Sequence, residues 1–561
     1  MAHLTKKKIK GKNYYYAREC QRVDGKVKTV WQKYIGTVDQ MVRLKEGDMV
    51  EPAEIHLIDA GGAAALYSLA EELKITKLID TIVPKRAQGP SFGQYMVVAA
   101  INRCLRACGK LSIPDWLNET PLPRWLKQPS ELFDSQAFWN HMHKMSRENI
   151  RAIEKELAQR VTRHYKLNLR TVLYDETNYF TFIHSFNERC TLAQRGRNKQ
   201  KRNDLRQIGL AVLVDSECQL PLFYDVYEGN RNDCVEFASV VDEMTERLMA
   251  LREGCEGITL IMDKGHNSKE NVKKLAAEGG VHFIGSLRPS DHAELLTVPF
   301  NKYTEVIDRE GWKAYRTTFS VFGEMCTVII TYNDELYIAQ EKVLWREIET
   351  AARKLAELQK KLDCPPARGL RRTKSGTEKN VATILKARHM KDIFTVKVYQ
   401  AQNGVRMKYQ IKHSAAQKLQ KQLFGKTILF TDQHDWPTKD IVGSYHAQYK
   451  IEDVFRLSKN ARGVSWFPMH HWTDHNIRVH AFYCMIGLLL AGALRIKLRE
   501  ANIDMSLERS LRHLQGIREV AQIYPNGQHR LTTNTVTQIQ KKLYNALGLK
   551  DWLPPLLGTT H

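Results

Sequence analysis

Four side chains between Tyr445 and Lys459 could act together on a phosphodiester. The segment YHAQYKIEDVFRLSK contains no Pro or Gly and follows a turn at Pro437, so it is predicted to be a helix. At about 100° per residue, Tyr445, Glu452 and Lys459 fall within roughly 40° of one another. Gln448 lies close to this stripe. A carboxylate can bind a divalent metal ion, and ammonium, amide and phenol groups can contact phosphate oxygens. The plainer alternative is a solvated stripe on an amphipathic helix.

Two aspartates occupy positions that would bring further carboxylates to the same place. Asp175 lies in the β-branched and aromatic segment RTVLYDETNYFTFIHSF, and Asp263 ends the buried segment GITLIMDKG. Three carboxylates from separate elements can hold two Mg²⁺ ions, which clamp the attacking and leaving oxygens of an in-line displacement at phosphorus. We therefore predict that Asp175, Asp263 and Glu452 bind metal and are catalytic.

Other acidic residues compete with this assignment. Asp215 follows a strand, but the residues after it predict a turn. Glu176 would point to the opposite face of the strand from Asp175. Asp432, which ends the apolar segment TILFTD, is the strongest alternative to Asp263, either as a supporting residue or as a plain strand end. Asp263 is preferred because its strand comes directly after the predicted helix at 232–252, as the strand beside that of Asp175 is expected to do.

The elements around the aspartates predict an α/β fold. Three strands of antiparallel type, a helix, a strand, a helix and a strand follow one another between residues 170 and 287. Asp263 and Glu452 are 189 residues apart (452 − 263 = 189), more than one helix and one strand require. We therefore predict an inserted β-rich and helical domain at 291–425, between two core parts at 166–290 and 426–500. Trp312 in this insertion either stacks on an unpaired base or, as we prefer, packs in a hairpin core.

The outer regions are less specific. Residues 1–50 form a basic region with a predicted hairpin at Asp24-Gly25, which is either a DNA-binding arm or a solvated tail. Residues 51–165 predict a helical domain for DNA binding or support, and 501–561 predict a C-terminal helical region.

The charge balance favours a polyanionic partner. The 561 residues include 85 Lys and Arg against 62 Asp and Glu, a net charge of +23. Nucleic acid is the first expectation and an anionic membrane surface the second. A basic loop at 194–207 is predicted to contact phosphates, with a solvated loop as the alternative. The candidate DNA-binding residues are Tyr445, Gln448, Lys459, Arg456, Lys264, Arg195, Lys199, Lys201 and Arg202.

Several other classes of protein are disfavoured. The longest apolar run, 482–494, is too short to span a bilayer and predicts a buried helix. The N-terminus lacks the apolar segment of a secretory signal. The ten cysteines are scattered without a CxxC motif, which indicates free thiols in a reducing cytoplasm. The histidines at 470, 471, 475 and 480 could suggest a metal site, but we prefer a helix capped by Thr473, with the histidines packed on the core or facing solvent.

Together these residues resemble the bacterial and archaeal DDE insertion-sequence transposases, in the group with a β-rich insertion and a Y-x2-R-x3-E-x6-K signature. Here the signature is Tyr445, Gln448, Glu452 and Lys459, with Gln in the place of Arg. The resemblance covers nearly the whole chain. Its supporting pieces are the Tyr-rich N-terminal hairpin, YDET, the basic loop before DLRQ, GNRND, MDKG and HHWTDHNIRVH.

The resemblance implies a ribonuclease H-like core and cut-and-paste transposition by a homodimer. Such enzymes use Mg²⁺, with Mn²⁺ as a substitute, to nick double-stranded DNA at terminal inverted repeats. The freed 3′-OH then attacks the other strand or the target DNA. In several members the signature Tyr, Arg and Lys contact the terminal phosphates of a hairpin, a clamp that the neutral Gln448 cannot make in bidentate charged form. The expected location is the cytoplasm, at the nucleoid. The alternatives are a catalytically impaired copy that acts as a DNA-binding regulator, and a structure-specific nuclease.

Overall fold

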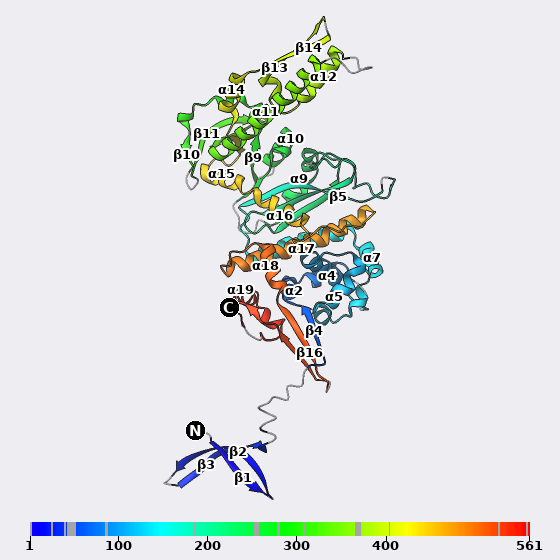
Figure 1. Cartoon of the computed structure of the whole chain (residues 1–561), viewed down its shortest axis with the longest axis vertical. Helices are drawn as coiled ribbons and strands as arrows, with labels where there is room; N and C mark the ends of the chain where they lie inside the picture. The colour runs from blue at the N-terminus through cyan, green and yellow to red at the C-terminus, as the bar shows by residue number, and fades with distance from the viewer. Residues whose placement is uncertain are drawn as a thin grey trace.

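The protein is a mixed α/β structure built around a nine-stranded sheet (Figure 1). The computed structural model describes residues 3–9, 11–23, 26–38, 41, 52–84, 88–184, 186–198, 200–251, 257–277, 281–306, 310–364, 372–402, 404–525, 528–556 and 559–560.

Five strands form the part of the sheet that carries the two aspartates. The first three make an antiparallel meander, and the other two add in parallel beside the first, in the spatial order β7-β6-β5-β8-β9. Along the chain, three strands, a helix, a strand, a helix and a strand follow one another, as the sequence predicts. The strands are β5 (Thr171–Thr181), β6 (Arg206–Asp215), β7 (Pro221–Glu228), β8 (Ile258–Ile261) and β9 (Val281–Leu287).

Alternation along these strands divides their side chains between two cores. Val172 and Leu260 pack with the crossover helices α9 (Asp233–Leu251) and α10 (Lys269–Ala277). Leu173 and Ile261, on the other face, belong to the core that also contains the apolar side chains of the region from 441 to 498. The parity of a residue on β5 or β8 therefore decides which layer of helices it faces.

Four further strands extend the sheet beyond β9. They are β15 (Lys426–Thr431), β12 (Glu324–Asn333), β11 (Trp312–Val321) and β10 (Thr304–Glu305), in that spatial order. The β-rich half of the predicted insertion thus continues the core sheet, because β15 returns from the insertion to pair with β9.

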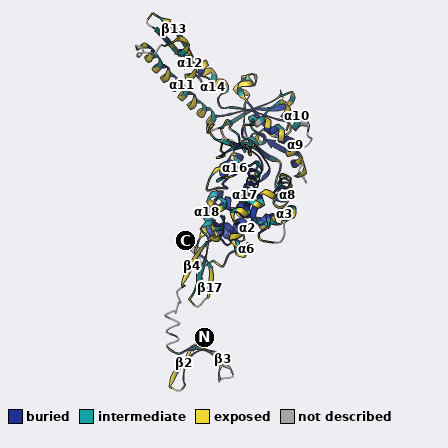
Figure 2. Ribbon diagram, turned by 90° about the vertical axis from the view of Figure 1, so that its right-hand side faces the viewer, coloured by how far each residue is buried: buried dark blue, intermediate teal, exposed yellow. Residues whose placement is uncertain are grey.

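The rest of the insertion forms an arm with its own apolar cluster, which includes Leu344, Leu355 and Met407. The arm projects from the sheet in both views (Figures 1 and 2). Its elements are α11 (Asp334–Asp363), α12 (Lys374–Ile384), α13 (Met390–Ile393), the hairpin β13 (Phe394–Ala401) and β14 (Gly404–Ile411), and α14 (His413–Leu423).

A long helix, α17 (Asp474–Glu500), lies between the sheet and the N-terminal helices (Figure 1). It is long and apolar enough to cross a membrane by length and composition, but its apolar stretch is almost completely buried inside the protein. The predicted buried helix is thus the central core helix. The helices around it are α2 (Gly61–Glu72), α3 (Ile75–Ile82), α4 (Phe92–Leu105), α5 (Ile113–Asn118), α6 (Leu122–Leu126), α7 (Ser135–Lys144) and α8 (Arg147–Tyr165).

The chain ends contain more strand than the sequence predicts. The N-terminal sheet has three antiparallel strands, β1 (His3–Ile9), β2 (Lys12–Val23) and β3 (Lys26–Gly36). The predicted turn residues Asp24 and Gly25 lie outside the described residues.

The prediction of a wholly helical C-terminal region was wrong. Besides α18 (Leu507–Gln515) and α19 (Gln538–Ala546), this region contains β16 (Arg518–Ile523), β17 (His529–Thr533) and β18 (Val536–Thr537). β16 pairs with β4 (Glu54–Asp59), which comes from the region predicted to be helical near the N-terminus. Two short strands that are more than 450 residues apart (518 − 59 = 459) contain no local signal that they pair with each other.

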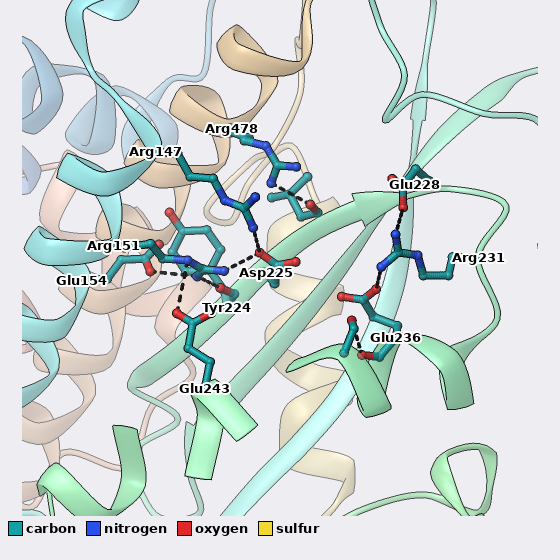
Figure 3. Close-up of polar contacts among 12 residues, drawn as sticks. Arg147, Arg151, Glu154, Tyr224, Asp225, Glu228, Arg231, Glu236, Glu243 and Arg478 are labelled. Carbon is teal, nitrogen blue, oxygen red and sulfur yellow. Dashed lines mark hydrogen bonds and ion pairs between the residues drawn. The ribbon is translucent and has the colours of Figure 1, made fainter. Parts of the chain in front are cut away.

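A buried ion network joins α8 to the edge strand β7 (Figure 3). Arg151 of α8 contacts the carboxylates of Glu154 (3.1 Å) and Glu243 (3.4 Å), and its Nη2 donates to Asp225 of β7. Burial raises the pKa of Glu154, although Arg151 opposes the shift. The network therefore depends on the guanidinium to hold buried carboxylates in place.

Candidate active site

Asp175 and Asp263 stand at the same level on neighbouring parallel strands. Leu173 of β5 pairs with Ile261 of β8, so each aspartate lies two residues beyond that pair. The backbone of Asp263 remains extended (φ −77°, ψ 162°). Adjacent strands run about 4.8 Å apart, and the even spacing places both carboxylates on the same face as Leu173 and Ile261. Both aspartates are half-buried.

Tyr445 contacts the equivalent position on the next strand, β9. Ser286 occupies the equivalent level on β9, and its hydroxyl accepts a 2.7 Å hydrogen bond from the phenol of Tyr445. Burial, with smaller contributions from the charges of Asp263 and Asp175, raises the pKa of Tyr445 to about 12. The phenol is therefore a neutral hydroxyl within electrostatic reach of both carboxylates.

The predicted helix from Tyr445 to Lys459 is two helices. α15 (Thr438–His446) ends before α16 (Tyr449–Lys459) begins. Between them, hydrogen bonds reach back three residues rather than four, from Gln448 N–H to Tyr445 and from Ile451 N–H to Gln448. The single stripe was therefore wrong in geometry, because a tightened turn separates Tyr445 from the helix of Glu452 and Lys459.

α16 runs alongside β5 in the same direction. Near its start, the Lys450 ammonium donates to the carbonyl of Ser216 (2.6 Å), whose hydroxyl contacts Thr171 at the start of β5. At its end, the Lys459 ammonium donates to the hydroxyl of Thr177. The start of α16 is thus attached near Thr171 and its end at Thr177, which comes later on β5, so helix and strand run in the same direction.

Glu452 lies between these two anchors. Glu452 comes two residues after Lys450 and seven before Lys459. On the strand, Asp175 likewise lies between the two contact points, Thr171 and Thr177. Glu452 is exposed, in the first turn of α16. This arrangement brings the helix of Glu452 along the strand of Asp175, with the carboxylate open to solvent.

The competing aspartates are engaged elsewhere. Asp432 pairs with His282 Nδ1 (2.8 Å) and accepts from the Phe283 N–H (2.9 Å), at the start of β9, whereas the row of the two aspartates lies near its end. Asp215 is buried and closes its own turn by accepting from the backbone N–H groups of Glu217, Cys218 and Leu220. Neither carboxylate competes for the face of Asp175.

Comparison with known proteins decides the family. A sequence profile described as the Transposase DDE domain matches residues 185–486, which is more than half of the chain. The chain belongs to the transposase DDE domain family. The matched range includes Asp263 and Glu452, and Asp175 lies ten residues before it.

One solved structure extends over most of the chain. It is the cryo-electron-microscopy structure of a piggyBac transposase synaptic complex with hairpin DNA, which is 9% identical with a TM-score of 0.37 and covers 83% of this chain and 82% of that chain. No curated protein matches the sequence. The nine-stranded mixed sheet is consistent with the ribonuclease H-like fold of DDE transposases.

The candidate site has the donor chemistry for a divalent metal ion. Among the described residues, no three His, Cys, Asp or Glu side chains are placed so as to enclose an ion by themselves. Mg²⁺, however, is usually bound by one or two carboxylates together with water and substrate phosphates. The adjacent Asp175 and Asp263 fit this pattern, with Glu452 on the solvent side.

Two histidines, His471 just before α17 and His480 within it, serve packing, whereas His470 is exposed. His471 and His480 are buried, and His480 Nε2 lies 2.8 Å from the carbonyl of Trp466. His471 contacts Lys110 (3.2 Å), and burial holds the pKa of both imidazoles well below the usual range. Thr473 caps α17 through the N–H of residue 476, as predicted. Of the predicted alternatives, the structure favours packing.

The candidate DNA-binding residues of the transposase divide into two groups. Lys459 is exposed beside the site, with its ammonium 5.2 Å from the ring centre of Tyr179. Gln448 is half-buried at the start of α16. Arg456, in contrast, pairs with Asp453 (3.2 Å) and with Glu508 of α18 (3.8 Å), so in this structure it contributes to the packing of α16.

The basic loop connects β5 to β6 at the end of the sheet where β8 reaches Asp263. Arg195 and Lys201 are exposed, and Arg202 pairs with Asp204 (2.8 Å). Lys199 lies outside the described residues. The loop therefore presents basic side chains on the edge that holds the site.

A groove of about 1070 Å³ leads away from the site toward the arm. Lys264, Ser286 and Tyr445 line its inner end, and its outer wall comes from α11 and the region around α13. Its further basic side chains are Arg288, Arg388 and Lys426. Asp291 and Glu347 also line the groove, so its four basic and two acidic side chains sum to a charge of +2 (4 − 2 = 2).

Behind the sheet, a buried pair links the segments of the two aspartates. As predicted, Glu176 faces away from Asp175; its carboxylate accepts from Tyr174 (2.7 Å) and lies 3.5 Å from His266 Nε2. Because His266 follows Asp263 by three residues, the pair joins both aspartate segments from the far face. Sequence reasoning missed His266, although its place in MDKGH was the available signal.

Replacing Glu176 by Gln is expected to lower DNA cleavage about ten-fold and to raise the Mg²⁺ concentration needed for half-maximal cleavage several-fold, because groups that orient metal ligands affect metal affinity by about 10–100-fold. A Mg²⁺ titration of cleavage rate measures both effects. Glu270→Gln, at an exposed position on α10, is the matched control. A folded E176Q protein with an unchanged titration would show that the pair has no role in positioning the aspartates.

Proposed function

We propose that this transposase cleaves double-stranded DNA at the ends of an insertion sequence and joins the freed 3′-OH to target DNA. The observation that carries the proposal is that Asp175 on β5 and Asp263, two residues past the end of the adjacent parallel strand β8, lie at the same level, with the helix of Glu452 alongside. Membership of the transposase DDE domain family supports the same reaction.

The three carboxylates would hold one or two Mg²⁺ ions, which neutralise charge on the phosphate and activate the attacking oxygen. Mn²⁺ is expected to substitute. The rest of the work falls to positioning, because phosphoryl transfer needs charge stabilisation and alignment more than a covalent nucleophile. The neutral Tyr445 hydroxyl, which donates to Ser286 in this structure, would turn its one hydrogen bond to a phosphate oxygen, and the Lys459 ammonium supplies a positive charge at the exposed end of α16.

We further propose that Tyr445, Gln448 and Lys459 contact the terminal phosphates of the element, as the signature residues of the insertion-sequence group do. Gln448 can donate only neutral hydrogen bonds, whereas an arginine makes a charged bidentate clamp. This difference favours a weaker hold on a hairpin end and is the observation behind a second candidate function, a DNA-binding regulator with impaired catalysis.

The proposed setting is a homodimer on DNA at the nucleoid, in the cytoplasm. A net charge of +23 supports a polyanionic partner. The remaining proposed contacts, through Lys264, Arg456 and the basic loop, are with the DNA backbone, which fixes register and orientation without reading sequence.

Incubation with labelled DNA that carries the terminal repeats flanking the gene tests this function. We expect cleavage at the element boundary in Mg²⁺ and none in EDTA, and we expect pre-nicked ends to be joined to target DNA. Cleavage without joining would indicate a structure-specific nuclease instead. Specific binding without cleavage would favour the regulator, and no binding to these ends would contradict the proposal.

A further inference from the structure

Three aromatic side chains are unusually exposed at one end of the sheet. Phe182, Phe186 and Trp472 keep 73%, 86% and 67% of their surface accessible, the highest values among the aromatic side chains that the structure describes. In contrast, Trp312, for which stacking on a base was one expectation, is half-buried with its ring 4.3 Å from that of His446. Exposed rings of this size are costly in water, and a group of them marks a binding surface.

The three residues come from two distant segments that hydrogen bonds hold together. The side-chain amide of Asn187 donates to the carbonyl of Trp472 (3.2 Å). The carboxylate of Asp474 accepts from the hydroxyl of Thr191 and from the Leu192 N–H (2.9 Å). The segment after β5 is thus attached to the start of α17. We call Phe182, Phe186 and Trp472 the aromatic platform.

The aromatic platform begins at the end of β5, the strand that also carries Asp175 of the proposed active site. Phe182 follows the last residue of this strand, and Asp175 lies seven residues earlier. At roughly 3.3 Å per residue, this separation is about 23 Å along the strand. Between them, Tyr179 stacks on Trp466 and lies beneath the ammonium of Lys459. A DNA strand that enters the site along α16 therefore passes toward the platform.

The charge around the platform selects the partner. Residues 182–207 contain seven Lys and Arg against two Asp and Glu, a net charge of +5 (7 − 2 = 5). One of these basic residues, Arg206, donates to the carbonyl of Asn187 (2.9 Å) and so belongs to the same structure. Exposed rings on a segment of net positive charge suit nucleic acid, in which bases stack on the rings while phosphates contact the cations.

We propose that the aromatic platform stacks on unpaired DNA bases several nucleotides from the cleavage point. This inference rests on the proposed transposase function and adds to it a site for opened DNA. Such a site would hold the strands apart near the element boundary, since bases that stack on protein rings are not available for pairing.

Binding to three fluorescent DNA probes tests the proposal. All three carry the terminal repeat and its flank; one is fully paired, one has a bubble of unpaired bases at positions 3–8 from the cleavage point, and one has the same bubble with abasic sites. Measured in EDTA by fluorescence anisotropy, the wild-type protein is expected to bind the bubble about ten-fold more tightly than the paired probe. The abasic bubble is expected to lose this preference.

The variants separate stacking from other roles. The double variant Phe186→Leu/Trp472→Leu is expected to lose the preference while its Kd for the paired probe changes less than two-fold. Phe186→Tyr/Trp472→Phe, which keeps the rings, is expected to retain it. Trp345→Leu, at an exposed position on the arm (41% accessible), is the control.

Two results would overturn the proposal while leaving the transposase function intact. One is a wild-type protein that binds the paired repeat without preferring the bubble. The other is a double variant that keeps the preference, or that changes only the oligomeric state measured by light scattering, which would make the platform a contact between copies of the chain. A wild-type protein that binds none of the probes would contradict the proposed function itself.

Discussion

Replacement of Glu452 by Gln is expected to abolish DNA cleavage, with a rate at least about a thousand-fold below that of the wild-type protein. The amide keeps the size of the side chain but removes its charge, and in the proposed site it leaves the two aspartates to bind metal alone. Because Glu452 is exposed on α16, the change is expected to leave the fold intact and DNA affinity within a few-fold. Cleavage of labelled terminal-repeat DNA and gel-shift binding measure the two properties.

The neighbouring residue provides the control for this experiment. Asp453 lies on the same turn of α16 and pairs with Arg456 (3.2 Å). Asp453→Asn is expected to cleave at nearly the wild-type rate, since an exposed ion pair contributes little to stability. Retained cleavage in E452Q, or equal loss in D453N, would show that Glu452 is not the third carboxylate of the site.

Replacement of Arg151 by Met is expected to destabilise the protein by about 3–5 kcal/mol, the usual cost of removing one partner from a buried ion pair. Glu154 and Asp225, which are both nearly buried, lose their shared partner, and Arg147 (3.8 Å from Asp225) is left as the ion pair between α8 and β7 (Figure 3). Calorimetry is expected to show a lower Tm for R151M. DNA binding at low temperature is expected to persist because the network lies away from the proposed DNA surface.

A second substitution tests the cause of this loss. Adding Glu154→Leu to R151M removes a buried carboxylate that has lost its nearer guanidinium and keeps only Arg247 (3.9 Å), and it is expected to recover part of the stability, as the coupling of neighbouring charges requires. Arg163→Met, at an exposed position on the same helix, is expected to leave the Tm nearly unchanged. A Tm for R151M equal to that of R163M would show that the network contributes no net stability.

The exposed aromatic platform and the buried pair of Glu176 and His266 have different relations to the sequence. Phe186 and Trp472 are 286 residues apart (472 − 186 = 286), and nothing in either local segment indicates that they meet. Glu176, in contrast, follows from strand alternation as soon as Asp175 is placed on a strand. Only the identity of its partner, His266, required the structure.

The sequence alone determined the succession of strands and helices along the core, the parity that separates Asp175 from Glu176, and the insertion between Asp263 and Glu452. These features depend on the hydrophobic period and on strand alternation, both of which can be read from consecutive residues. The tertiary structure decided that β10, β11, β12 and β15 extend the core sheet, that β4 pairs with β16, and that α15 and α16 are separate. It also decided that α16 runs alongside β5. These outcomes depend on which strand edges and helix faces, distant in the sequence, are available for pairing and packing. The residues of a short segment do not specify which distant segment will pair with it.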